Sequence, residues 1–384
     1  MHFEFATASR IIFGPGTVRE VPAAAKAFGR RALLVVGGAG RGTDVLIRAL
    51  DSEGVRVSEF RVTQEPAVEL VLAGLDRARA GECDVIIAVG GGSVIDAAKA
   101  IAALLANPGT IYDYLEVVGK GQPLPNPSVA CIAVPTTAGT GSEVTRNAVI
   151  AVKERKVKVS LRGPSILPRL AIVDPELTYS LSASVTATSG LDALTQLIEP
   201  FLSTASNPMT DAVCSEGIRR VARSLKLACE RADDRAARED MALASLFSGM
   251  ALANAKLGAV HGFAGPIGGM FPASHGSICA RLLPVVFEIN LRALRQRSHN
   301  SPILDRFAQV AQLLTSDPHT TPEAGTLWLR ELCNALRVPP LAAHGVSTSD
   351  FAEIIAQAKK ASSMKGNPVE LTDEELTGVL DSAL

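Results

Sequence analysis

The first half of the chain alternates short apolar runs with amphipathic segments, and this alternation limits its fold more than any other feature. The runs of strand length span 32–36, 55–62, 84–89 and 129–134. The segments with helical spacing span 43–53, 67–80 and 93–106. Strands separated by helices pair in parallel, because each helix returns the chain to the same edge of the sheet. We therefore predict an α/β domain with a doubly wound parallel sheet.

The second half has a different pattern. From Thr186 onward, Leu, Ala and Ile recur at helical spacing with few β-branched runs, and proline-containing breaks separate the segments. The expected helices span 208–230, 235–257, 301–314 and 322–336. A chain of 384 residues is long enough for two cores. We place the boundary near 178–184, with an α/β domain at 1–180 and an all-α domain at 181–384.

Composition excludes several classes of function. The net charge is -1, with 38 basic and 39 acidic residues, which argues against nucleic acid or an anionic membrane as a partner. Apolar runs such as 97–106 are shorter than the roughly 20 residues that a bilayer requires. The six cysteines form no Cys-x-x-Cys pair, and we interpret them as reduced core thiols. With no signal peptide evident at 1–13, we expect a cytoplasmic protein.

Three consecutive glycines, Gly90, Gly91 and Gly92, join a predicted strand directly to a predicted helix. Without side chains the backbone there can approach a phosphate, and the free N–H groups at the start of the helix favour an anion. Ser93 is expected to cap this helix, with Asp96 three residues later in an arrangement close to a capping box. The turn therefore predicts a phosphate-binding site, with a plain strand-to-helix connection as the alternative.

A second polar loop, at 135–143, follows the predicted strand at 129–134. It carries two glycines and four hydroxyl side chains, Thr136, Thr137, Thr140 and Ser142. Ligands of open α/β sheets bind at the carboxyl ends of the parallel strands, where this loop begins. A ligand-binding loop is therefore one interpretation, and an ordinary connecting loop is the other.

Two histidines and one aspartate form the third candidate site. His261 and His275 are each followed by glycine, and the glycines and proline at 265–269 are expected to break any continuous helix between them. Asp192 lies in a segment whose apolar residues suggest a buried helix, with Gln196 and Glu199 on roughly the same face. A buried carboxylate needs a partner or a metal. By spacing alone, a metal site, structural histidines and a solvated carboxylate all remain open.

Together these motifs resemble the iron-containing, or group III, alcohol dehydrogenase family. The resemblance covers almost the whole chain, and several motifs in a fixed order are more specific than any one of them. The matching segments are Phe13–Gly16, Gly90–Lys99, Pro135–Thr145, Asp174–Leu177, Gly190–Glu199, Gly258–Pro284 and Asn367-Pro368.

The resemblance implies a site for NAD or NADP. It assigns the pyrophosphate to Gly90–Ser93, with Asp96 nearby, and Gly37 and Gly38 to the end of the first cofactor-binding strand. It also implies that four hydroxyl side chains line the cofactor path and that a lysine lies near it. These residues are Thr136, Thr137, Thr140, Ser142 and Lys158.

The first cofactor-binding strand departs from the usual dinucleotide fingerprint. The segment Gly38-Ala39-Gly40 is followed by Thr43 where a third glycine would stand. Many NAD-preferring members of the family carry an aspartate at the position of Gly37. Its absence, with Arg41 nearby, permits NADP(H).

The family holds its metal with one aspartate and three histidines between the two domains, and Asp192, His261 and His275 match three of these ligands. Gln196 stands where the family has a histidine four residues after the aspartate. Another family histidine, four residues after His261, is here Gly265. An amide oxygen is a weaker ligand than imidazole for iron or zinc. We therefore expect a variant member whose altered site, including Gln196, can still bind a divalent metal, Fe or Zn.

The resemblance implies an NAD(P)-dependent oxidoreductase that interconverts an alcohol with an aldehyde or ketone, with a metal acting as a Lewis acid. It also implies a homodimer, with dinucleotide binding in domain 1–180 and metal and substrate binding in domain 181–384. Asp192, His261 and His275 are the expected catalytic residues, and either histidine can assist protonation. One alternative is a metal-independent reductase, as in the related maleylacetate reductases. A dehydroquinate-synthase-like lyase would need a basic pocket, for which Lys256, Lys158 and Arg146 are candidates. A non-catalytic nucleotide-binding protein is the third alternative.

Overall fold

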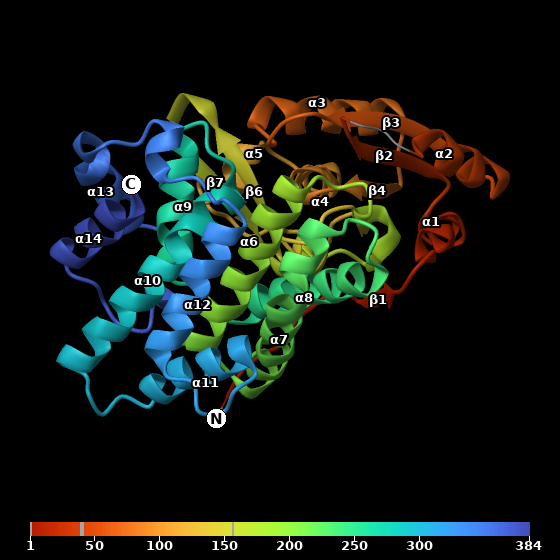
Figure 1. The fold of residues 1–384 in the computed structure, drawn as a ribbon. Coiled ribbons are helices and arrows are strands. Elements are labelled where there is room, and N and C mark those ends of the chain that lie inside the picture. Colours follow the sequence, from red (N-terminus) through yellow and green to blue (C-terminus); the bar gives the residue numbers. More distant parts are fainter. Residues whose placement is uncertain (1, 39–41, 156) are drawn as a thin grey trace. The chain divides into compact units, whose positions relative to one another are not determined.

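The computed structural model describes residues 2–38, 42–155 and 157–384 (Figure 1). Ala39, Gly40 and Arg41, which bear on the fingerprint and on NADP(H), lie outside the described residues. The chain divides into two compact units. The α/β unit comprises 6–137 and 141–179, and the helical unit comprises the chain up to Phe5, 138–140 and 180–384.

A six-stranded parallel sheet forms the centre of the α/β unit, as predicted. The strand order among the described residues is β1-β8-β5-β4-β2-β3. These strands are β1 (Arg10–Phe13), β2 (Arg31–Gly37), β3 (Arg56–Val62), β4 (Val85–Gly90), β5 (Ala130–Pro135) and β8 (Leu170–Val173). Two further strands, β6 (Asn147–Val152) and β7 (Val157–Arg162), form a separate antiparallel pair. The sequence pattern indicated β2 to β5 but not the other four.

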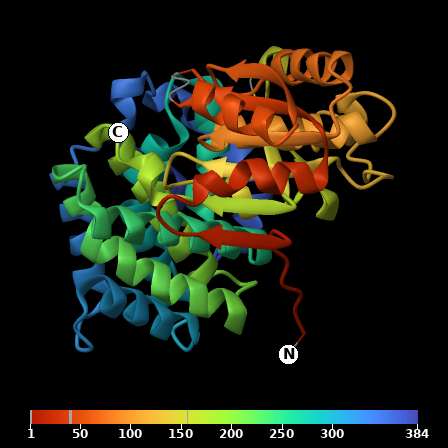
Figure 2. The same ribbon diagram turned by 90° about the vertical axis from the view of Figure 1, so that its right-hand side faces the viewer.

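Helices cover both faces of the sheet (Figure 2). Successive side chains of a strand point to opposite faces. Leu33 and Val35 of β2 therefore pack with α3 (Val68–Ala80) and α4 (Gly92–Ala106). Leu34 and Val36 pack with α1 (Val21–Phe28) and α2 (Thr43–Ser52) on the other face. A short helix, α5 (Ile111–Tyr114), follows α4.

The order in which the chain adds strands to the sheet reverses between β2 and β4. These two strands are neighbours, with β3 beyond β2 on one side and β5 beyond β4 on the other. The carboxyl ends of adjacent parallel strands at such a reversal are where open α/β sheets bind ligands. Gly37 ends β2 and Gly90 ends β4, so the two predicted glycine turns begin at this position.

The described part of the second unit is helical from Ala183 onward, as predicted. Helix α6 packs against α7, α8 and α10, which explains why its residues from Gly190 to Leu202 are all buried. The helices are α6 (Ala183–Leu202), α7 (Pro208–Glu230), α8 (Arg235–Asn254), α9 (Ala259–Met270), α10 (His275–Arg297), α11 (Ile303–Thr315), α12 (Pro322–Ala335), α13 (Phe351–Ala358) and α14 (Asp373–Ala383).

The expected helix break at 265–269 is wrong. Helix α9 continues through Gly265 and Pro266 to Met270, and the interruption comes only before α10 begins at His275. A proline inside a helix removes one backbone hydrogen bond, here to the carbonyl of Gly262. The apolar face that contains Ala259, Phe263 and Ile267 is fully buried and stabilises the helix despite this loss.

Helix α8 ends at Asn254, earlier than the expected 257, and the chain bends by 97° before α9. By length and composition, no single helix in the described ranges could cross a membrane, although α8 and α9 taken together as a bent pair pass that test.

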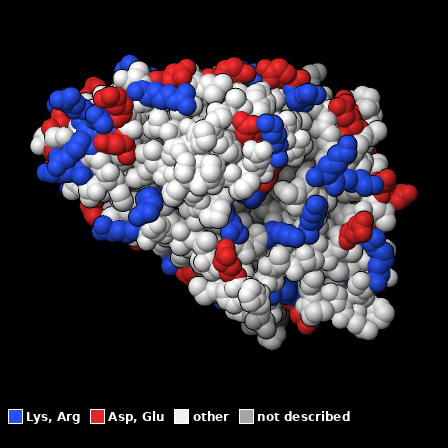
Figure 3. Space-filling model, turned by 180° about the vertical axis from the view of Figure 1, so that it is seen from behind, with Lys and Arg blue, Asp and Glu red and all other residues white. Residues whose placement is uncertain are grey.

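Charged side chains of both signs are mixed over the face seen in Figure 3. This distribution agrees with the near balance of 38 basic and 39 acidic residues. Basic and acidic side chains also form surface ion pairs, for example Lys26 with Glu53 and Arg295 with Glu323.

Candidate active site

The glycine turn lies at the carboxyl edge of the sheet. Gly90 pairs with Pro135 of β5, and the amide of Thr136 donates to the carbonyl of Gly90 over 3.0 Å. A Cβ atom at Gly91 would lie 3.3 Å from the side chain of Thr137. The polar loop after β5 therefore lies against the glycine turn after β4, and Thr136 and Thr137 lie beside the predicted phosphate site.

Helix α4 begins differently from the prediction. Gly91, not Ser93, is the N-cap residue, and no side chain caps the helix. The amides of Val94 and Ile95 both donate to the carbonyl of Gly91. The expected capping box is therefore wrong, because the helix starts one residue earlier, at Gly92. The first N–H groups of a helix have no helical acceptor, so an uncapped start offers donors to an anion.

A buried lysine ties Asp96 and Ser142 into a network inside the α/β unit. Lys99 Nζ donates to Ser142 Oγ over 2.9 Å and to Thr145 Oγ1 over 2.9 Å. Ser142 Oγ in turn donates to Asp96, whose other oxygen accepts from the amide of Val149 over 3.0 Å. Burial lowers the pKa of Lys99, against the opposing effect of Asp96. These two predicted cofactor contacts thus join α4 to the loop after β5 and to β6.

The remaining predicted cofactor residues lie in different surroundings. Lys158 of β7 forms an ion pair with Glu65, with 2.5 Å between Nζ and Oε2. Thr140 belongs to the helical unit, together with Gly139, whose carbonyl oxygen lies 3.2 Å from Ser248 Oγ. The four hydroxyl side chains of the polar loop are therefore divided between the two units.

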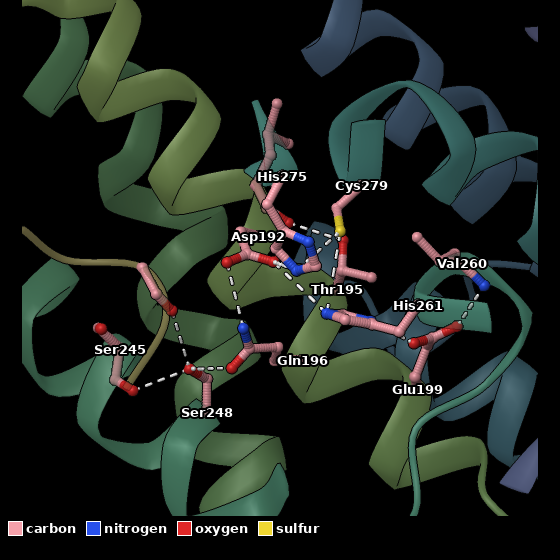
Figure 4. Close-up of polar contacts among 12 residues, drawn as sticks. Asp192, Thr195, Gln196, Glu199, Ser245, Ser248, Val260, His261, His275 and Cys279 are labelled. Carbon is pink, nitrogen blue, oxygen red and sulfur yellow. Dashed lines mark hydrogen bonds and ion pairs between the residues drawn. The ribbon is translucent and has the colours of Figure 1, made fainter. Parts of the chain in front are cut away.

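The helical unit brings Asp192, His261 and His275 together (Figure 4). They come from three helices: Asp192 from α6, His261 from α9, and His275 from the first position of α10. Asp192 Oδ1 lies 3.5 Å from His261 Nε2 and 3.7 Å from His275 Nε2. Cys279, one turn along α10, completes the group, and its ligand atom lies within 4.8 Å of the other three.

Neighbouring segments approach two of these helices closely at a glycine. A Cβ atom at Gly276 would lie 2.6 Å from the Thr188 carbonyl oxygen of α6, and one at Gly262 would lie 2.7 Å from Met364 Cε. The glycine after each histidine therefore serves close packing within a helix.

Neighbouring side chains orient the cluster. Glu199 Oε2 lies 2.6 Å from His261 Nδ1, and Glu199 Oε1 accepts from the amide of Val260 over 2.7 Å. This contact leaves His261 Nε2 directed at Asp192 and Cys279 (Figure 4). A histidine held by a carboxylate in this way is typical of metal sites.

Gln196 makes contacts that differ from those of a metal ligand. Its Nε2 donates to Asp192 Oδ2 over 3.1 Å, and its Oε1 accepts from Ser248 Oγ over 3.3 Å. The amide thus fixes the position of the Asp192 carboxylate. Ligation by Gln196 stays a prediction.

The donor set fits a divalent metal. Asp192 is buried, yet its Oδ1 makes no hydrogen bond to the described part of the chain. Burial alone would raise the pKa of Asp192, but His275 and His261 hold it below its usual range. Two nitrogen or oxygen ligands of a tetrahedral ion, each about 2.1 Å from it, lie about 3.4 Å apart. The carboxylate–imidazole distances of 3.5 and 3.7 Å are close to this value.

Cys279 and Glu199 are the two residues whose place in the cluster the sequence analysis missed. Cys279 is not only a core thiol. It follows His275 by four residues, and positions i and i+4 share one helix face, so the spacing could have indicated that the two side chains lie together. Glu199 was placed on the face of Asp192, but nothing in the sequence connected it with His261.

The fold and these residues are those of a dehydrogenase with an α/β unit, a helical unit and a plausible metal site. Residues 8–175 match the model of the iron-containing alcohol dehydrogenases, and residues 186–384 match the C-terminal model of the same family. The chain belongs to the iron-containing alcohol dehydrogenase family, and it is an alcohol–aldehyde oxidoreductase.

Individual relatives agree with this assignment. Alcohol dehydrogenase 4 of Saccharomyces cerevisiae is 36% identical over 88% of this chain and 85% of its own length. A crystal structure of a 1,3-propanediol oxidoreductase has a TM-score of 0.93 and 33% identity, covering 100% of both chains. Sulfoacetaldehyde reductase from Bifidobacterium kashiwanohense, solved with NAD+, has a TM-score of 0.87 and 28% identity, over 100% of this chain and 99% of its own.

Proposed function

We propose that this enzyme transfers hydride between NAD(P)H and an aldehyde or ketone with the help of a divalent metal held by Asp192, His261 and His275. The observation that carries this proposal is the buried Asp192 Oδ1, which faces two imidazoles without a hydrogen bond in the described chain. A bare carboxylate oxygen in such a place is costly unless a cation binds it. NAD+ in the sulfoacetaldehyde reductase relative supports the choice of cofactor.

In the proposed reaction, hydride passes from the dihydronicotinamide to the carbonyl carbon, and the carbonyl oxygen gains a proton to give the alcohol. The metal, when bound, stabilises the negative charge that develops on this oxygen. The uncapped amides at the start of α4 bind the pyrophosphate. Glu199 keeps the Nδ1 proton of His261, so that Nε2 stays free to act as a ligand. The His275 side chain is 37% exposed and is the member of the cluster that solvent protons can reach.

We also propose that the site departs from the family pattern. Gln196 hydrogen bonds to Asp192 where the family has a histidine ligand. At Gly265, a Cβ atom would meet nothing within 4 Å in the described ranges, so open space lies on α9 where the family has a second histidine. This departure is what favours the metal-independent alternative, in which the enzyme works as the maleylacetate reductases do.

The test is steady-state oxidation of NADH and NADPH with a panel of aldehydes and ketones, before and after metal removal verified by elemental analysis. We expect kcat/KM to fall at least about 100-fold without metal and to recover when Zn²⁺ or Fe²⁺ is added. An unchanged rate would establish the metal-independent alternative. Cofactor that is never oxidised with any carbonyl would instead favour the lyase or the nucleotide-binding protein.

The comparison of NADH with NADPH also tests cofactor preference. Strand β2 ends in Gly37, with no carboxylate to repel a 2′-phosphate. We propose that NADP(H) is accepted as well as NAD(H). A kcat/KM for NADPH that is lower by more than about 100-fold, or about 3 kcal/mol, would contradict this proposal.

We further propose a homodimer in a reducing compartment such as the cytoplasm. All six cysteines lie within the described ranges and are free thiols, which supports a reducing environment. The dimer is what the family resemblance implies. Light scattering on the purified protein tests it, and a monomeric mass would overturn it.

A further inference from the structure

We infer that Cys279 is a thiolate ligand of the metal, and that the site is therefore built for Zn²⁺ rather than Fe²⁺. The inference rests on the metal-binding part of the proposed function. Thiolate is a soft ligand that favours zinc, whereas the Asp and three His of the family pattern contain no sulfur. One carboxylate, two imidazoles and one thiolate are all donors that zinc accepts, and a substrate oxygen would enter as a fifth ligand.

The position of the sulfur supports ligation. Cys279 Sγ lies 3.6 Å from His275 Nε2 and 3.8 Å from His261 Nε2. In a tetrahedral zinc site, with Zn–N about 2.1 Å and Zn–S about 2.3 Å, the nitrogen and sulfur lie about 3.6 Å apart. The thiol thus stands at ligand spacing from both imidazoles, on the same helix face as His275 (Figure 4).

The four donors also surround one point from three helices. All four ligand atoms lie within 4.8 Å of one another. Asp192 approaches from α6, His261 from α9, and the other two from successive turns of α10. An ion bound among them is therefore held by the tertiary structure and not by one local segment.

The contacts of Gln196 favour a fourth ligand from another helix. The family's fourth ligand comes from this position on α6, and here the side chain is engaged with Asp192 and Ser248. Cys279 lies on α10 and supplies a donor atom to the same cluster. The fourth ligand has thus moved from one helix to another, and its chemistry has changed from imidazole to thiolate.

Other cysteines of the chain have no such surroundings. Cys131 packs inside the apolar core of the α/β unit, and Cys214 inside that of the helical unit. Cys333 Sγ donates to the backbone carbonyl of Ala280 over 3.3 Å. Cys229 is partly exposed on α7 and outside the cluster, which makes it a suitable control position.

Cobalt substitution tests the inference without any measurement of activity. The metal is removed from the full-length protein, and Co²⁺ is added while the absorption spectrum and bound cobalt are recorded. We expect a thiolate-to-cobalt charge-transfer band in the near ultraviolet that saturates when one ion is bound per chain. The Cys279→Ser variant should bind cobalt without this band, and the Cys229→Ser variant should keep it.

The outcomes separate the two proposals. Cobalt bound to the parent protein without a charge-transfer band overturns thiolate ligation and leaves the proposed function intact. Failure to bind cobalt counts against the metal site itself, and therefore against both. Competition between Zn²⁺ and Fe²⁺ measures the ratio of the two affinities. In the Cys279→Ser variant this ratio should favour zinc at least about tenfold less than it does in the parent. Circular dichroism establishes whether each variant is folded. If a variant is unfolded, the absorption spectrum of the cobalt-loaded parent protein still decides whether a thiolate binds the metal.

Discussion

Single side chains outside the proposed ligand set hold the proposed ligands in place. Glu199 accepts two hydrogen bonds, one at each oxygen, from the Val260 amide and from His261 Nδ1. Gln196 and Ser248 hold the Asp192 carboxylate in the same indirect way. The sequence indicated Asp192, His261 and His275 because few histidines occur and the motifs resemble a known family. It gave no sign that Glu199 and His261, 62 residues apart, are in contact.

We expect Glu199→Gln to weaken metal binding by about 10- to 100-fold. An amide has one oxygen, so it cannot accept both of the hydrogen bonds that the carboxylate accepts. Competition between the protein and a chromophoric chelator for Zn²⁺ measures the effect. The control is Glu288→Gln, which changes a half-exposed carboxylate paired with Arg330 on the same bundle. Equal zinc affinities for the two variants would mean that Glu199 does not position His261.

Glu143 gives a prediction for pH dependence. Burial raises its pKa from 4.5 to about 7, and its Oε1 has no hydrogen-bond partner in the described chain. The folded state therefore holds a proton that the unfolded state releases between pH 4.5 and 7. The contribution of this proton to the free energy of unfolding is complete below pH 4.5 and decreases as the pH rises. Above about pH 7 the whole contribution, on the order of 3 kcal/mol, is lost.

We expect Glu143→Gln to remove this dependence, because the amide cannot ionise. The melting temperature of the variant should exceed that of the parent above pH 7, and the two should converge towards pH 4.5. Thermal melts across this range measure the difference. A variant whose advantage is constant with pH, or grows as the pH falls, would show that Glu143 is not the group responsible.

Helices and their ends bring the ligands together. Periodicity predicted seven of the fourteen described α-helices to within a few residues, because each of the seven has an apolar face that repeats every three or four positions. It failed at the start of α4, where Ser93 was expected as the cap, and inside α9, where glycine and proline were expected to break the helix. Packing decides the second case, because α9 buries its apolar face.

We expect Gly276→Ala to destabilise the helical unit by about 1–3 kcal/mol, since the new Cβ would lie 2.6 Å from the Thr188 carbonyl oxygen. Relief of this contact moves α10 away from α6, so metal affinity should fall as well. The matched control is Gly378→Ala in α14, where the nearest atom is 3.9 Å from the new Cβ. Melting temperature and zinc competition are measured on both. If the two variants behave alike, close approach at Gly276 does not set the position of His275.

At the scale of the whole molecule, the proposed nucleotide site and the proposed metal site lie on separate compact units. The alternation of strands and helices predicted the central strands β2 to β5. It could not predict that β1 pairs with β8, because these strands are separated by more than 150 residues and each is only four residues long. The sequence nevertheless predicts that the two proposed sites lie in different units, because the glycine turn and the aspartate–histidine group lie in different halves of the chain.

This division predicts that the two sites can be disabled separately. We expect Asp192→Ala to lower kcat/KM by more than about 100-fold while the dissociation constant for NADH changes by less than about threefold. The glycine turn and α4 belong to the other unit and do not contain the altered side chain. Fluorescence titration of NADH, beside steady-state kinetics, measures both quantities. Loss of nucleotide binding together with activity would contradict the separation.

The most direct test of a metal-assisted dehydrogenase is a single-turnover experiment on metal-free, full-length protein. The protein is loaded with NADH and titrated with Zn²⁺, and oxidation of the cofactor by a saturating aldehyde is followed after each addition. The cluster of Asp192, His261, His275 and Cys279 predicts a rate that rises in proportion to bound zinc and stops rising at one ion per chain. A rate that is already maximal before any zinc is added would contradict the account.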